Sequence, residues 1–206
     1  MGIGEFTRII TREIRHGLQK REAKTLSSAD RTVLEKLDQQ GFCLLPQFKS
    51  PAECASLRLE LDRLLSDSGT KLWQSKSGAD RRIFGADRIS PLIAAFFQDP
   101  YISHIIDAYE KSSRKTGFTM ASHISFKEGN TGSGEGWHRD RADYKQTKAI
   151  LYLSNVNENN GPTQYIEGSH GFRSVWFRGW RAGLAPLETR MKDEAVEDYL
   201  RTNKSE

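Results

Sequence analysis

The apolar residues of this chain change their spacing near residue 118, from the three-to-four-residue period of helices to the two-residue period of strands. Upstream, a capping residue followed by proline predicts three helix starts, at Ser50, Ser90 and Asp99. An earlier helix is predicted over residues 29–40. Downstream, residues 118–127 alternate between apolar and polar, and further strands are predicted over residues 148–154 and 163–166. Helices followed by strands predict a β-barrel or β-sandwich with an N-terminal helical layer.

The size of the chain predicts a single domain. Its 206 residues are enough for one sizeable core and too few for two comfortable domains. No stretch is apolar for long enough to cross a bilayer, and the first residues lack the features of a secretory signal. We therefore expect a cytoplasmic protein without a transmembrane segment. Cys43 and Cys54 are too few for a disulfide framework and predict ordinary small thiols.

Much of the positive charge behind the net charge of +4 lies near the N-terminus. There, arginine and lysine are interleaved with isoleucine and leucine at helical spacing, which predicts a basic amphipathic segment over residues 1–26. Such a helix either packs its apolar stripe on the domain or rests on an anionic membrane or nucleic acid. We favour packing on the domain and expect no nucleic-acid partner, because residues 118–170 hold nothing that would serve one.

A histidine and an aspartate lie two residues apart at the end of a glycine-rich loop. The loop covers residues 129–136, and Trp137-His138-Arg139-Asp140 follows it. Residues two apart on an extended segment point to the same side, so the imidazole of His138 and the carboxylate of Asp140 can bind one metal ion. They are two-thirds of the 2-His-1-carboxylate arrangement that holds non-haem iron(II). The alternative is a surface pair in a hairpin loop, because motifs this short also arise by chance.

Several motifs, in their order along the chain, resemble the phytanoyl-CoA dioxygenase family of iron(II)- and 2-oxoglutarate-dependent oxygenases. They are Gly41-Phe42 before a short predicted strand, Trp137 to Asp140, the Asn160-Gly161 turn, and Glu167-Gly168-Ser169-His170, where the family usually has Pro-Gly-Ser-His. The resemblance implies a double-stranded β-helix, a jelly-roll, cupin-like barrel, and hence a mainly β fold with N-terminal helices. It implies a dioxygenase with Fe(II) and 2-oxoglutarate as cofactors. This enzyme would use O2 to hydroxylate a small-molecule or acyl substrate and would decarboxylate 2-oxoglutarate to succinate.

Carried over to this sequence, the resemblance implies that His138 and Asp140 bind Fe(II). On the strand before the glycine-rich loop, the polar face carries His123 and Ser125, which we expect to line the cofactor pocket. Tyr152, on the strand after the motif, is expected to reach the same pocket. An ordinary hydrogen-bonded interior role explains His123 equally well, and barrel packing explains Tyr152 equally well.

The second histidine of the metal site has no obvious source in this sequence. His170 follows Asp140, but the resemblance places the histidine of that turn outside the metal site. It puts the distal ligand many residues later, before an arginine that pairs with 2-oxoglutarate. Arg173, Arg178 and Arg181 are expected on the surface or on a substrate-facing loop. We therefore expect the last barrel strands to be missing.

Two explanations of the missing strands remain open. The chain is either an incomplete version of a longer enzyme or a natural short form. A short form would complete its site by another route, or would be inactive and act as a non-catalytic binding module.

The predicted organisation is a basic segment over residues 1–26 followed by one oxygenase-like domain over residues 27–206. The domain is expected to contain a helical buttress (27–112), jelly-roll strands (113–170) and a C-terminal helical segment (171–206) with a polar helix over residues 187–202. Because an incomplete barrel leaves strand edges open, we also expect homo-oligomers that associate through these edges.

Overall fold

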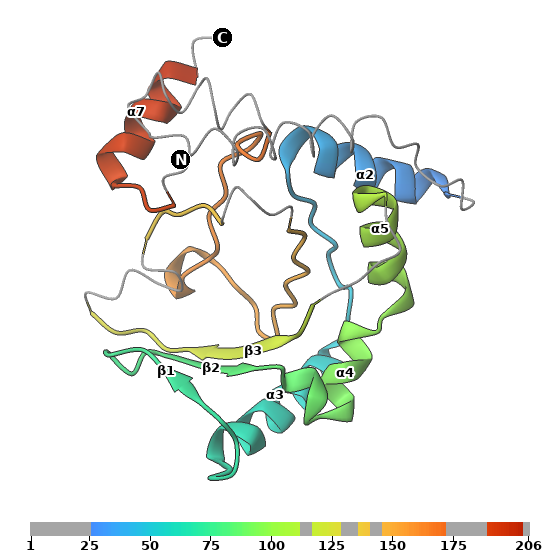
Figure 1. The fold of residues 1–206 in the computed structure, drawn as a ribbon, viewed down its shortest axis with the longest axis vertical. Coiled ribbons are helices and arrows are strands. Elements are labelled where there is room, and N and C mark those ends of the chain that lie inside the picture. The colour runs from blue at the N-terminus through green and yellow to red at the C-terminus, as the bar shows by residue number, and fades with distance from the viewer. Residues whose placement is uncertain (1–25, 112–116, 129–135, 141–145, 172–188, 204–206) are drawn as a thin grey trace, which may run out of the picture.

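The computed structural model describes residues 26–111, 117–128, 136–140, 146–171 and 189–203. Figure 1 shows a small sheet near one end, helices packed below it and along one side, and long connecting segments between them. In chain order the elements are α2 (Ser28–Gln40), α3 (Pro51–Ser66), β1 (Trp73–Gln74), β2 (Asp80–Phe84), η1 (Ala86–Arg88), α4 (Pro91–Phe97), α5 (Pro100–Glu110), β3 (Met120–Ile124), η2 (Glu158–Asn160) and α7 (Asp193–Asn203). Within these ranges no helix is long and apolar enough to cross a membrane. Nearly all of the predicted basic segment, 1–26, lies outside the described residues.

The helices of the N-terminal half begin where the sequence predicted them. At the start of α3, the hydroxyl of Ser50 accepts a hydrogen bond from the N–H of Glu53 at 3.2 Å. The carboxylate of Glu53 accepts one in return from the N–H of Ser50 at 2.8 Å. Ser27 and Asp30 form the same reciprocal pair at the start of α2. These bonds satisfy backbone donors that a helix start leaves without partners, so each helix is fixed by its own sequence.

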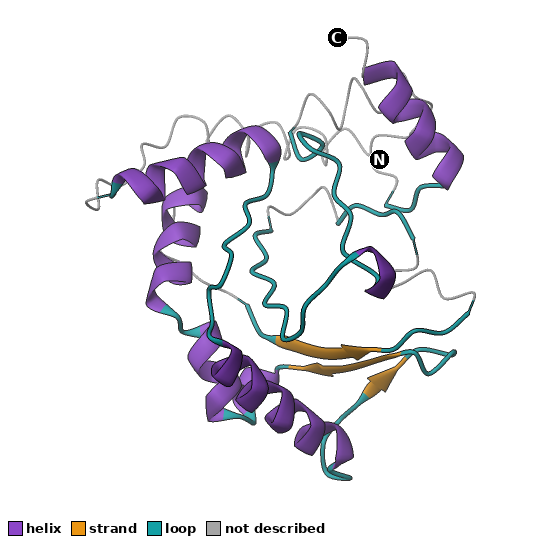
Figure 2. Ribbon diagram, turned by 180° about the vertical axis from the view of Figure 1, so that it is seen from behind, coloured by secondary structure: helices purple, strands orange, loops and turns teal. Residues whose placement is uncertain are grey.

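The sheet is antiparallel, with strand order β1-β2-β3. Its register places Ile83 opposite Ala121 and Phe84 opposite Met120. The predicted strands over residues 148–154 and 163–166 run instead as connecting segments without strand pairing, as the loops in the centre of Figure 2 show. The described residues therefore show the expected N-terminal helices, but only the small three-stranded sheet of the expected β fold. The physical reason is that a strand needs a ladder partner, and these two segments have none within the described part of the chain.

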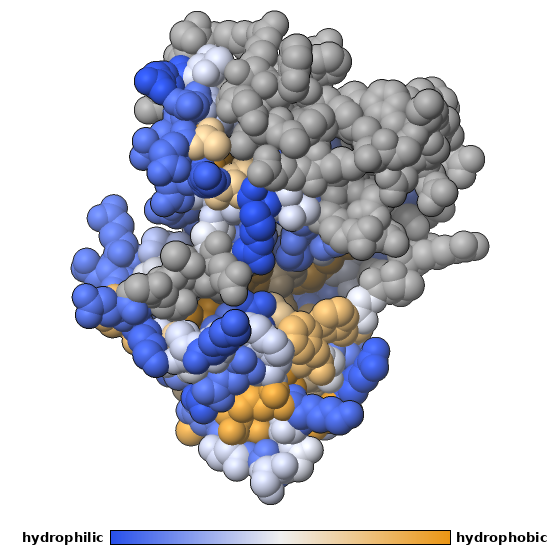
Figure 3. All heavy atoms as spheres, turned by 60° about the vertical axis from the view of Figure 1, so that its left-hand side comes forward, coloured by the Kyte–Doolittle hydropathy of each residue, from blue (hydrophilic) through white to orange (hydrophobic). Residues whose placement is uncertain are grey.

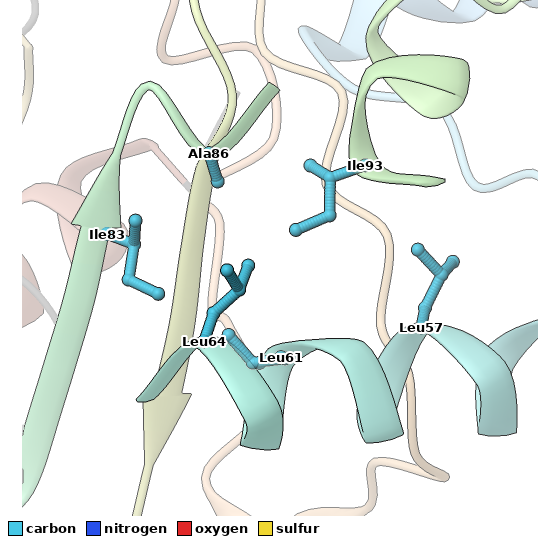
Figure 4. Close-up of a cluster of buried hydrophobic side chains, with 6 residues drawn as sticks. All are labelled: Leu57, Leu61, Leu64, Ile83, Ala86 and Ile93. Carbon is cyan, nitrogen blue, oxygen red and sulfur yellow. The ribbon is translucent and has the colours of Figure 1, made fainter. Parts of the chain in front are cut away.

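The core lies between α3 and one face of the sheet. Leu61 and Leu64 project from α3 toward Ile83 of β2, Leu57 lies further along α3 on the side of Ile93, and Ala86 completes the buried cluster (Figure 4). Leu151 and Leu153 pack against the same cluster. Arg58 of α3 also donates a hydrogen bond to the carbonyl of Leu153. The connecting segment that follows the His-x-Asp motif is therefore anchored in the core by its apolar residues.

The opposite face of the sheet carries exposed apolar side chains together with the ion pair of Asp80 and Arg82. Phe84 and Met120 face each other across β2 and β3, and the ring of Phe118 lies 6.1 Å from that of Phe84. Phe126, just beyond β3, is 95% exposed. Figure 3 shows such apolar surface beside charged residues in the lower half of the molecule, where the sheet and α3 lie. The alternation predicted for residues 118–127 is present, although β3 covers only its middle.

Candidate functional site

His138 lies in an extended segment that pairs with a part of the chain about fifty residues away. It forms an isolated antiparallel bridge with Arg190. Backbone hydrogen bonds flank the bridge, from the N–H of Arg139 to Thr189 (2.9 Å) and from the N–H of Met191 to Trp137 (3.0 Å). The extended geometry expected for the motif is therefore present. The predicted helix over 187–202 starts later than expected, at Asp193, because residues 189–191 pair with this segment.

The imidazole of His138 is held by its own backbone. Its Nδ1 lies 3.0 Å from the carbonyl oxygen of Gly136, in a hydrogen-bonding geometry. A carbonyl can only accept, so Nδ1 carries a proton, and the neutral imidazole then has its lone pair on Nε2. The side chain is exposed, which leaves Nε2 accessible to a ligand. Metal-binding histidines are commonly oriented in this way, with one ring nitrogen donating to a carbonyl and the other facing the metal.

The carboxylate of Asp140 is paired with a cation. Its Oδ2 lies 2.7 Å from Nζ of Lys148, and both side chains are about half exposed. The sequence gave no signal for this pair, because it depends on how the segment of Lys148 meets the motif in space. The same holds for Arg190, whose position beside His138 depends on long-range pairing alone.

The other predicted pocket residues have different partners. His123 lies opposite Arg81 in the sheet, and its Nδ1 is 3.1 Å from the guanidinium. Ser125 is exposed and is bonded through its backbone N–H to the turn before β2. The hydroxyl of Tyr152 lies 2.5 Å from Oγ1 of Thr163. In the described residues, none of these bonds reaches His138 or Asp140, although the segment of Tyr152 reaches Asp140 through Lys148.

His170 lies against the end of α2. The N–H of Gly168 donates to the carbonyl of Gln40 at 2.8 Å, which docks the turn at 167–170 on that helix. A Cβ atom on Gly41 would come within 2.4 Å of Nδ1 of His170. Over the ranges that the structure describes, no group of three or more histidine, cysteine, aspartate or glutamate side chains is arranged to hold a metal ion. His170 therefore does not join His138 and Asp140 in such a group. Arg173, Arg178 and Arg181 lie outside the described residues.

The sequence matches the model of the phytanoyl-CoA dioxygenase (PhyH) family over residues 37–178, more than half of the chain. The chain belongs to this family. Membership implies the double-stranded β-helix fold, of which the described residues show the N-terminal helices and a three-stranded antiparallel sheet. His138, Asp140 and Lys148 all lie inside the matched region.

Similar curated proteins include ectoine dioxygenases from several bacteria. The protein from Stutzerimonas stutzeri (strain A1501) is 26% identical over an alignment of 158 residues, and the match covers 67% of this chain and 49% of that protein. The protein from Bordetella bronchiseptica is 24% identical over 163 residues, and the match covers 72% of this chain and 52% of that protein. The protein from Streptomyces coelicolor is 23% identical over 179 residues, and the match covers 80% of this chain and 57% of that protein. The chain thus spans about half the length of the curated relatives it matches.

Among solved structures, the chain is similar to the epimerase SnoN, crystallised in complex with Fe3+, alpha ketoglutarate and nogalamycin RO. The match has a TM-score of 0.36 and 20% sequence identity, and it covers 41% of this chain and 34% of that chain. A likeness of this size supports no conclusion about the present protein.

Proposed function

We propose that the protein is an Fe(II)- and 2-oxoglutarate-dependent dioxygenase that hydroxylates a small-molecule or acyl substrate. One observation carries the proposal: His138 and Asp140 lie on one extended segment within the region that matches the family. Side chains two residues apart on such a segment share a side, so both reach one ion. Membership of the family supports Fe(II) and 2-oxoglutarate as the cofactors. The imidazole of His138 and the carboxylate of Asp140 support a bound metal ion.

The residues present fit an iron(II) ion. Imidazole and carboxylate are the ligand types of non-haem iron sites, and the tautomer of His138 leaves Nε2 for coordination. The 2-His-1-carboxylate triad requires a second histidine. Within the described ranges no third histidine, cysteine, aspartate or glutamate side chain lies with His138 and Asp140 so as to complete a metal site. When bound, iron(II) and 2-oxoglutarate supply the activation of O2. The protein residues orient the two ligands.

The proposed cofactor pocket includes His123, Ser125 and Tyr152. Tyr152 has the most direct support, because it lies four residues after Lys148, whose ammonium group contacts Asp140. His123 and Ser125 belong to the polar alternation of residues 118–127. For the substrate, ectoine is the first compound to test, since the similar curated proteins are named ectoine dioxygenase.

The test is an anaerobic Fe(II) titration of the 206-residue chain, with and without 2-oxoglutarate. We expect a weak visible charge-transfer band from the iron–2-oxoglutarate chelate, and loss of that band in His138→Ala. His104→Ala is the matched control, because His104 lies on α5 and pairs with Asp30 rather than with the motif. His170→Ala tests whether His170, the histidine that follows Asp140 in the sequence, supplies the third ligand. A band that disappears in His170→Ala would identify His170 as the missing ligand.

The same titration, followed by admission of O2 and measurement of succinate, separates the enzyme from a non-catalytic binding module. A chain that is folded by circular dichroism, shows no band and forms no succinate would contradict the proposed activity for this chain. It would support the alternative, in which a truncated or inactive jelly-roll form acts as a binding module. A band together with succinate release would exclude that alternative.

A further inference from the structure

The carboxylate that is proposed to bind iron already has a cationic partner in this chain. Nζ of Lys148 lies 2.7 Å from Oδ2 of Asp140, a distance typical of a charge-assisted hydrogen bond. We propose that Lys148 competes with the metal ion for Asp140 and so sets the metal concentration at which the site fills. This inference rests on the proposed function, because it requires Asp140 to be a metal ligand.

The competition follows from the charges. A divalent ion on Asp140 would stand within a few ångströms of the ammonium group of Lys148, and two cations at that separation repel each other. Metal binding must therefore either displace Lys148 or proceed against this repulsion. Metal ligands must be free of competing protons and cations before they coordinate, so the Lys148 pair lowers the apparent affinity.

The structure allows the side chain of Lys148 to move while its backbone stays in place. Three and five residues further on, Leu151 and Leu153 pack against the core cluster, and Arg58 donates to the carbonyl of Leu153. The side chain of Lys148 is 56% exposed, so the ammonium can leave Asp140 for water without burying its charge. Only the lysine rotamer has to change, and the core contacts of the segment are kept.

The test measures metal affinity directly and does not require turnover. Mn(II) is titrated into each variant, and the loss of the electron paramagnetic resonance signal of the free ion reports binding. We expect Lys148→Met to bind Mn(II) about tenfold more tightly than the wild-type chain, because it removes the competing charge. Lys148→Arg keeps the cation and is expected to bind like the wild type. Lys71→Met removes an exposed lysine from the loop between α3 and β1, and it controls for the change in net charge.

Asp140→Asn and His138→Ala separate the failure of this inference from the failure of the proposed function. If both variants bind Mn(II) as the wild type does, the metal site is wrongly placed and the competition is overturned with it. If both lose binding while Lys148→Met binds no more tightly than the wild type, the site stands and the competition is wrong. If Lys71→Met binds Mn(II) as tightly as Lys148→Met does, the competition is also overturned. The change in net charge alone would then explain the higher affinity. Lys148→Gln and thermal unfolding of every variant ensure that a folding defect is not mistaken for either result.

Discussion

Gly41 and His170 lie in direct contact, although 128 residues separate them in the sequence: a Cβ atom on Gly41 would stand 2.4 Å from Nδ1 of His170. Gly41 also ends α2 in the left-handed conformation, with φ +87°. Two motifs of the family resemblance thus meet in space, the Gly-Phe pair after the first helix and the Gly-Ser-His turn. Glycine is required there for two separate reasons, its backbone angle and the space it leaves.

Replacing Gly41 by alanine is expected to destabilise the protein by about 2–4 kcal/mol, through left-handed strain and overpacking against His170. Gly161 isolates the first cause, because its φ is +71° and a Cβ there would meet nothing within 4 Å. Gly161→Ala should therefore cost only about 1–2 kcal/mol. Urea unfolding of both variants gives the comparison. Equal losses would mean that the contact between Gly41 and His170 is not formed in solution.

Two leucines on α3 offer a test of the core. Leu61 is 7% exposed and belongs to the buried cluster, whereas Leu59 on the same helix is 71% exposed. Leu61→Ala is expected to cost about 2–5 kcal/mol, because it removes buried methyl groups and leaves a cavity. Leu59→Ala should change the free energy of unfolding by no more than about 0.5 kcal/mol. Thermal or urea unfolding measures both values, and similar losses would show that α3 packs on a different face.

Glu60 on α3 predicts a specific dependence of stability on pH. Its carboxylate accepts two hydrogen bonds from Arg63, at 2.8 and 2.9 Å. These bonds, with a further one from Ser90, lower the pKa of Glu60 from 4.5 to about 2. Because the pKa of Glu60 is lower in the folded state than in the unfolded chain, the ionised carboxylate stabilises the folded state at pH values above the unfolded pKa of 4.5. This contribution is then lost as the pH falls from 4.5 through about 2.

Glu60→Gln should therefore lower the unfolding temperature at pH 7, and the difference from the wild type should shrink steadily below pH 4.5. Glu35→Gln, on the exposed side of α2, is the matched control and should show a smaller difference at pH 7. The measurement is thermal unfolding across this pH range. A difference that stays constant down to pH 2 would contradict the assignment.

The helix starts could be predicted from the sequence because capping is local. Ser50 and Glu53 are three residues apart and satisfy each other's backbone, so no distant residue is needed. Strand β2 was missed for the opposite reason. It carries Asp80 and Arg82, which read as surface residues, yet Asp80 is buried and bonded to Arg82 at 2.9 and 3.0 Å. This internal pair neutralises the charge, and no alternation of apolar residues reveals it.

In the candidate site, too, the local motif could be predicted from the sequence and its distant partners could not. His138 and Asp140 were found because two residues on one extended segment form a local motif. The partners of this motif come from elsewhere, Arg190 through a backbone bridge and Lys148 through an ion pair. Neither could be predicted from spacing, because each depends on how distant segments meet. The metal ligands themselves remain a prediction, which the titrations above decide.

The last prediction concerns association of the protein with itself. In the described residues, β3 has a partner strand on one side only, and the apolar side chains next to it are exposed. An open, apolar strand edge favours pairing with another chain, and a lysine at such an edge opposes it. Sedimentation velocity should therefore show concentration-dependent dimers, and Phe126→Lys should weaken them. Leu44→Lys is the control, because Leu44 is 78% exposed but lies between α2 and α3. A wild-type chain that stays monomeric at all concentrations, or equal effects of the two substitutions, would show that this edge is not the site of association.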